Sequence, residues 1–128
     1  MSQKAQNAPQ HAVVWTEIPV SDLDKAMDFY GAVFQCDLSK DDAGPNQIAM
    51  FPTADGMGVA GHLYPGTPAK EGSGPTVHFT VTDSLAQARE RVRSAGGSAH
   101  DLEIAIPAGA FCYASDPDGN SLGLFKAA

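Results

Sequence analysis

Three side chains able to move a proton or hold a metal stand in apolar, strand-like parts of the sequence: Glu17, His62 and His78. A carboxylate accepts a hydrogen bond or a proton, and an imidazole donates or relays one near neutral pH. The three also make a two-His, one-carboxylate set of the kind that binds iron or zinc. Two interpretations stay open. Either Glu17 and His78 form a hydrogen-bonded pair inside the domain with His62 at its rim, or all three line a ligand pocket in which Glu17 and His78 are the candidate catalytic residues.

An internal repeat places Glu17 and His78 at equivalent positions. Residues 15–22 (WTEIPVSD) and 76–83 (TVHFTVTD) both show a strand-like pattern that ends at an acidic residue before a helical pattern, and each copy later contains an Asp-Gly turn. A unit of this length that occurs only twice predicts one domain built from two halves. Equivalent positions of the two halves are then expected to line a shared concave cavity.

Hydrophobic patterning predicts the elements that position these side chains. The polar stretch 39–46 interrupts the pattern of the first half. The predicted order is a strand at 12–20, a helix capped by Ser21 or Asp22 and reaching Phe34, strands at 47–51 and 57–64, a strand at 77–81, a helix capped by Asp83 and ending at Gly96-Gly97, and strands near 98–104, 110–115 and 120–126.

The last predicted hairpin fixes a strand register. Its turn, Asp116-Pro117-Asp118-Gly119, matches a type I turn followed by a glycine with positive φ, which pairs Tyr113 with Gly123 and Phe111 with Phe125. Residues 1–10 are expected to be a flexible tail. We expect a single domain at 11–128, with modules at about 11–64 and 76–126 and a linker at 65–75.

Composition limits the classes of partner. The chain has 128 residues, 43% hydrophobic and 18% charged, with a formal net charge of −7 and no basic cluster. Nucleic acid and membrane are therefore not expected partners. Neither an apolar membrane-spanning run nor a signal-peptide pattern is visible, so we expect a cytoplasmic protein. Cys36 and Cys112 lack metal-site spacing and are expected to be inert thiols.

Two motifs carry a resemblance to a known family. Residues 22–30 (DLDKAMDFY), at the start of the first helix, and 116–120 (DPDGN), in the last hairpin, resemble those of the vicinal oxygen chelate superfamily. That group includes glyoxalase I, bleomycin-resistance proteins, fosfomycin-resistance enzymes and extradiol dioxygenases. The resemblance covers residues 12–126. It implies an α+β domain of two βαβββ modules, with curved mixed sheets around a cavity, and a homodimer.

The resemblance also indicates where a metal would bind. Metal-dependent relatives place one ligand on the first strand and one on the last strand of each half. Counting from the motifs puts these positions at Trp15, Ala60, Thr76 and Gly123, none of which is a usual ligand of a divalent ion. We therefore predict no metal cofactor, with a divalent metal on Glu17, His62 and His78 as the alternative.

Large side chains share the predicted inner face with these groups. They form either ordinary core or an aromatic wall for a flat or apolar ligand. The candidate ligand-binding residues are Trp15, Glu17, Met50, His62, Thr76, His78, Phe111, Tyr113 and Phe125. The leading functional hypothesis is metal-independent binding of a small, partly apolar molecule, as in the bleomycin-resistance type of relative. The alternative is an enzyme, namely a lyase, isomerase or dioxygenase, either metal-free or with the shifted metal set.

Overall fold

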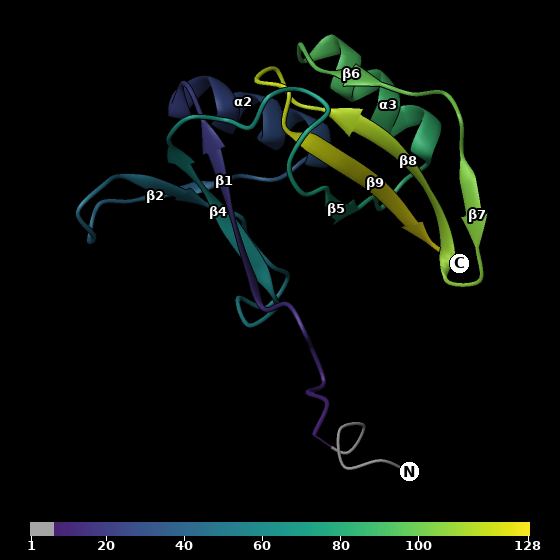
Figure 1. Cartoon of the computed structure of the whole chain (residues 1–128), viewed down its shortest axis with the longest axis horizontal. Coiled ribbons are helices and arrows are strands. Elements are labelled where there is room, and N and C mark those ends of the chain that lie inside the picture. The colour runs from purple at the N-terminus through teal and green to yellow at the C-terminus, as the bar shows by residue number, and fades with distance from the viewer. Residues whose placement is uncertain (1–6) are drawn as a thin grey trace.

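The computed structural model describes residues 7–128, which form two β-sheets and two helices (Figure 1). The predicted tail falls partly on residues 1–6, which lie outside the described residues. The elements are β1 (Trp15–Val20), α2 (Leu23–Phe34), β2 (Ser39–Asp41), β3 (Ile48–Met50), β4 (Ala60–Pro65), β5 (Val77–Thr80), α3 (Leu85–Ser94), β6 (Ser98–Ala99), β7 (Ile104–Ile106), β8 (Gly109–Ser115) and β9 (Ser121–Ala127).

Each half of the chain forms one mixed sheet. The first sheet has the order β1-β4-β3-β2, with β1 parallel to β4 and the other pairs antiparallel. The second has the order β5-β9-β8-β6, with β5 parallel to β9 and β7 also paired to β8. Because β6 and β7 follow one another along β8, they act as one interrupted strand. The predicted α+β fold of two βαβββ modules is confirmed.

A single core joins the helices to one side of each sheet. Along β1, Ile18 and Val20 are buried against the helices, whereas Trp15 and Glu17 face the other way, as strand alternation requires. Phe34 of α2 stacks on Phe79 of β5 with ring centroids 4.5 Å apart, which links the two halves. We call the side of each sheet that faces away from the helices its open face.

The 116–120 turn of the second half is anchored on the first half. Tyr30 of α2 donates a hydrogen bond to the buried Asp116 carboxylate at 2.7 Å, and the Asn120 amide donates to the Pro19 carbonyl at 2.9 Å. Burial, together with the Asp116 carboxylate, raises the pKa of Tyr30 above its ordinary value, so the phenol stays a donor. Gly119 adopts a φ of 90°, as the turn requires. These bonds fix the end of β1 beside the start of β9.

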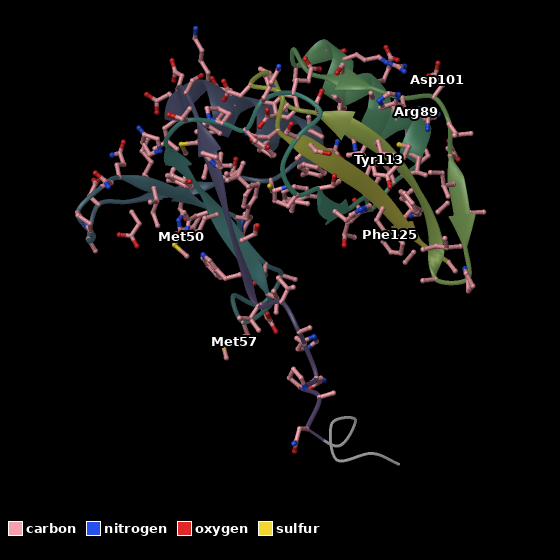
Figure 2. All side chains as sticks on the ribbon, in the orientation of Figure 1. Met50, Met57, Arg89, Asp101, Tyr113 and Phe125 are labelled. Carbon is pink, nitrogen blue, oxygen red and sulfur yellow. The ribbon has the colours of Figure 1, made fainter. Side chains whose placement is uncertain are left out.

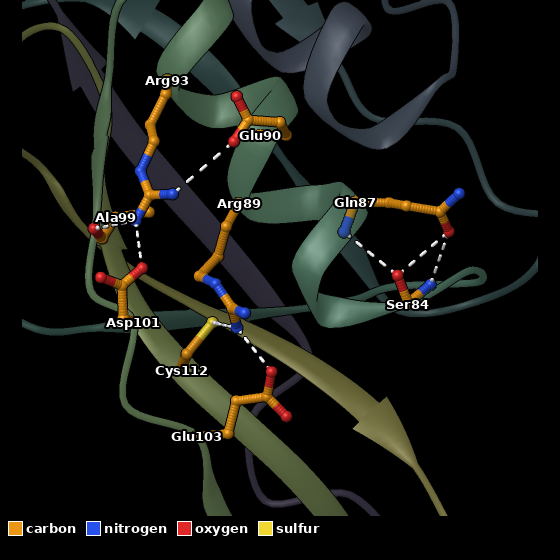
Figure 3. Close-up of polar contacts among 9 residues, drawn as sticks. All are labelled: Ser84, Gln87, Arg89, Glu90, Arg93, Ala99, Asp101, Glu103 and Cys112. Atoms are coloured by element: carbon orange, nitrogen blue, oxygen red, sulfur yellow. Dashed lines mark hydrogen bonds and ion pairs between the residues drawn. The ribbon is translucent and has the colours of Figure 1, made fainter.

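The helix starts follow local capping chemistry. Asp22 caps α2, one of the two predicted residues. Ser84 caps α3 through a capping box with Gln87 (Figure 3), so the predicted cap Asp83 was wrong by one residue. Asp83 instead binds Arg91, which holds the pKa of that carboxyl below its usual range.

The predicted strand 98–104 is divided in two by contacts with α3. Arg93 binds the Ala99 carbonyl and Asp101, and Arg89 binds Glu103 at 2.7 Å (Figure 3). These bonds pull the chain between β6 and β7 towards the helix. A second difference is β2, a polar strand within the stretch where no strand was predicted. In the part of the chain that the structure describes, neither helix is long and apolar enough to cross a membrane.

Candidate functional site

The two open faces carry all of the sequence-predicted site residues. Pairing across the strands places Trp15, Glu17, Met50 and His62 on the first open face, and Thr76, His78, Phe111, Tyr113 and Phe125 on the second. Figure 2 shows Met50 on the first sheet and Tyr113 and Phe125 on the second. The predicted hairpin register, Tyr113 with Gly123 and Phe111 with Phe125, is confirmed.

A chain of two polar contacts crosses the first open face, the first of them a hydrogen bond. The Trp15 indole Nε1 donates to His62 Nδ1 at 3.0 Å, and His62 Nε2 lies 3.2 Å from Glu17 Oε1. Glu17 and His62 are directly opposite one another on β1 and β4, which explains the second contact. The His62 side chain is 12% exposed and that of Glu17 is 66% exposed. The chain therefore runs from a half-exposed indole through a largely covered imidazole to a carboxylate in water.

The indole sets the protonation pattern of His62. A ring nitrogen that accepts a hydrogen bond carries no proton, so neutral His62 has its proton on Nε2. His62 Nε2 lies 3.2 Å from Glu17 Oε1, a close polar contact that does not have hydrogen-bond geometry. Trp15 thus orients an imidazole that lies beside an exposed carboxylate, and this carboxylate can accept a hydrogen bond from a ligand next to an aromatic surface.

The second open face has an aromatic character. His78 lies opposite Gly123, and a side-chain carbon at Gly123 would overlap the imidazole ring. The ring therefore lies over the glycine. It also meets Phe111 and Tyr113 edge to face, with ring centroids 5.2 and 6.1 Å away. Beside it, the hydroxyls of Thr76 and Ser121 are hydrogen-bonded at 2.6 Å.

The structure separates Glu17 from His78 although they are equivalent in the repeat. Glu17 contacts His62 on the first sheet, while His78 contacts Phe111 and Tyr113 on the second. Within residues 7–128, no hydrogen bond, ion pair or aromatic contact joins Glu17 to His78. The interpretation of these two residues as one hydrogen-bonded pair is therefore replaced by a Glu17–His62 pair.

Strand register also corrects the counting of metal positions. His62 lies opposite Glu17 and Gly123 lies opposite His78, so the counterpart of Gly123 in the first half is His62. The sequence-based assignment of Ala60 was wrong, because the segment between the Asp-Gly turn and β4 is longer than its counterpart in the second half.

The residues at the corrected positions do not fit a divalent metal. Only His62 is a usual ligand, and its Nδ1 already accepts the Trp15 indole proton. At the other end, the His78 ring covers the position that Gly123 leaves open. Within residues 7–128, no group of three or more His, Cys, Asp or Glu side chains is arranged to hold a metal ion, so Glu17, His62 and His78 are not assembled into one set.

Comparisons with known proteins agree with this fold. The sequence model of the Glyoxalase/Bleomycin resistance protein/Dioxygenase superfamily matches residues 11–124. A search of curated protein sequences found no significant match. Among solved structures, a glyoxalase/bleomycin resistance protein from Albidiferax ferrireducens is similar, with a TM-score of 0.68 and 18% identity over 92% of this chain and all of that one.

Two further structures have related names. A fosfomycin resistance protein from Listeria monocytogenes has a TM-score of 0.66 and 16% identity over 92% of this chain and 94% of its own. A glyoxalase I variant from Zea mays has a TM-score of 0.67 and 21% identity, over 88% of this chain and 44% of its own. At identities this low, the structural similarity establishes a shared fold alone.

Proposed function

Because the chain belongs to the glyoxalase/bleomycin resistance protein/dioxygenase superfamily, we propose that its open faces bind a small, partly apolar molecule without a metal at the usual positions. The Trp15–His62–Glu17 chain is the observation that carries this proposal. An indole surface receives a flat or apolar group, and an adjacent carboxylate receives a hydrogen bond from a polar group. A ligand of mixed character matches both.

The proposed independence from metal is supported by the chemistry of the four positions. The Trp15 indole donates its hydrogen bond to His62, Thr76 is a weak metal ligand, and Gly123 has no side-chain ligand atom. Removing divalent ions should therefore leave ligand binding unchanged. Binding of a confirmed ligand before and after treatment with EDTA measures this, and a loss that zinc, nickel or iron restores would contradict it.

A thermal-shift screen of small aromatic compounds tests the binding proposal. A ligand selective for the folded protein raises its melting temperature by mass action. The confirmed compound is then titrated against Glu17→Gln, which keeps the shape and removes the charge. We expect about tenfold weaker binding, the cost of one charge-assisted hydrogen bond. Glu90→Gln, on the outer side of α3, is the matched control. Equal affinity in the two variants would remove Glu17 from the site.

We further propose that a second copy of the chain completes the binding cleft. Trp15 on the first open face and Tyr113 on the second are each 42% exposed. Large exposed apolar side chains of this kind are typical of an interaction surface. Sedimentation velocity over a range of concentrations should give a dimer, and Tyr113→Glu should weaken it. A monomer at all concentrations would contradict the proposal.

Acid–base catalysis is the second candidate function. It is favoured by one observation, the carboxylate of Glu17 with Oε1 3.2 Å from His62 Nε2, since a carboxylate beside an imidazole can act as a base. A confirmed ligand with an acidic C–H bond would then exchange that hydrogen for deuterium in heavy water, and Glu17→Gln would lose the exchange. If the ligand exchanges this hydrogen no faster with the protein than in buffer alone, acid–base catalysis is rejected and ligand binding is the only activity proposed.

A further inference from the structure

A separate cavity of about 190 Å³ lies at the seam between the two sheets. Its wall combines four consecutive residues of β1, the start of β9, Val77 of β5 and the linker. The lining residues are Thr16, Glu17, Ile18, Pro19, Ala69, Ser73, Pro75, Val77, Asn120, Ser121 and Leu122. Side chains of a strand alternate between its two faces, so four consecutive residues can line one space only along the edge of the strand. The cavity therefore faces the backbone of β1.

Among the described residues, 7–128, no strand lies beside this edge of β1. β1 is the last strand of the first sheet, and in this part of the chain it pairs with β4 alone. The carbonyls of Thr16 and Val20 point to the β4 side: a side-chain carbon at Gly61 would overlap the Thr16 oxygen, and Gly66 donates to the Val20 oxygen. In a strand, alternate residues direct their backbone groups to opposite edges. The groups of Glu17 and Pro19 therefore point to the cavity.

Within that edge, one donor and one acceptor are free. Pro19 has no N–H, and its carbonyl already accepts from the Asn120 amide. Glu17 keeps both its N–H and its C=O, and within residues 7–128 no hydrogen bond engages either group outside the β1–β4 ladder. The cavity therefore contains one N–H and one C=O from the same residue, the set that a strand residue offers to an antiparallel partner.

We propose that the seam cavity binds an N-acylated α-amino acid amide, that is, one residue of peptide backbone with small caps. Its N–H donates to the Glu17 carbonyl and its C=O accepts from the Glu17 N–H, as in a hydrogen-bonded antiparallel pair. The space equals the liquid volume of about six water molecules, which admits a small residue such as glycine and excludes a protein segment with large side chains.

The remaining walls suit the same ligand. Pro19 and Pro75 lie on the wall and add no N–H that would compete for the ligand carbonyl. Val77, which is partly exposed, provides apolar surface. Ser121, whose hydroxyl shares a hydrogen bond with Thr76, offers a polar contact for a capping amide. This site is distinct from the open faces, because it uses the backbone of Glu17 and the open face uses its side chain.

The test compares two probes on the native protein by NMR of backbone amides. N-acetylglycine N-methylamide has the required N–H, whereas N-acetylsarcosine N-methylamide has a methyl group in its place and keeps every carbonyl. We expect the first to move the Glu17 and Ser121 amide signals saturably and the second to bind about tenfold more weakly, the cost of one hydrogen bond left unmade. No saturable shift at Glu17, or equal affinities, would overturn the proposal.

A pair of variants separates this site from the open face. Glu17→Pro removes the N–H, and Pro19 shows that this edge accepts proline. Glu17→Ala keeps the N–H and removes the carboxylate. We expect Glu17→Ala to retain the glycine probe while losing affinity for an open-face ligand, and Glu17→Pro to lose both. If Glu17→Pro does not fold, Ala69→Phe should block the cavity from the linker, with Thr67→Phe as its control. Retention of the glycine probe by either blocking variant would contradict the site.

Discussion

The two open faces have the same backbone plan and different chemistry. On the first sheet, Glu17 lies opposite His62, and the two side chains form a polar pair. On the second, His78 lies opposite Gly123, and its ring lies over the glycine beside two aromatic rings. The repeat therefore preserves strand register, while the chemistry of each face depends on the residue across the strand. Equivalent positions in a repeat need not be partners.

The largest expected difference between the two halves concerns a glycine in the last strand of each module. A side-chain carbon at Gly61 would overlap the backbone carbonyl of Thr16, which cannot move without separating β1 from β4. One at Gly123 would overlap only the exposed His78 ring, which can rotate away. Gly61→Ala should therefore destabilise the fold by about 3 kcal/mol, and Gly123→Ala by less than about 1 kcal/mol.

Urea unfolding of both variants measures this contrast. The two substitutions add the same carbon to the last strand of each module, so each is a control for the other. If Gly123→Ala were as damaging as Gly61→Ala, His78 would be held rigidly over the glycine, and the second open face would have to be regarded as a packed element of the structure.

A smaller effect concerns which side chains are coupled. Glu17→Gln and His62→Ala should show non-additive effects on unfolding free energy, because either change breaks the same contact. The coupling should be about 0.5 kcal/mol, since Glu17 is largely exposed. Glu17→Gln and His78→Ala should be additive. A double-mutant cycle for each pair measures this, and coupling between Glu17 and His78 alone would restore the sequence-based pairing.

Local patterns predicted most of the fold and only part of the site. The α2 helix and the β8–β9 register follow from helical spacing and from one turn motif, both of which are local in sequence. The strand β2 was missed because its residues, Ser39 to Asp41, are polar and carry no apolar alternation. The Glu17–His62 contact depends on the parallel register of β1 and β4. Counting residues from the Asp-Gly turn does not give this register, because the first half has two more residues before β4 than the second half has before β9. Such long-range register requires coordinates.

Sequence patterns also did not predict the interruption between β6 and β7, where the chain contacts α3. The charged spacing of Arg89, Glu90 and Arg93 along α3 is typical of a solvated helix face, yet Arg89 and Arg93 bind Glu103 and Asp101 in the segment between β6 and β7. Arginine has a long side chain whose partner can lie on another element, and periodicity along the helix does not reveal that partner. The sequence does contain the two acidic partners, Asp101 and Glu103. They could be recognised as partners of α3 only once the position of that segment beside the helix was known.

The smallest expected effect is a spectroscopic difference between the two histidine environments. Trp15 is the only tryptophan, and its indole N–H donates to His62 Nδ1. In His62→Ala the indole loses this acceptor, a hydrogen bond worth about 1 kcal/mol. The emission of Trp15 should therefore change in His62→Ala and stay unchanged in His78→Ala, where the second open face alone is altered. Equal emission in the native protein and both variants would mean that the indole does not sense His62, and the chain of contacts on the first open face would lose its first link.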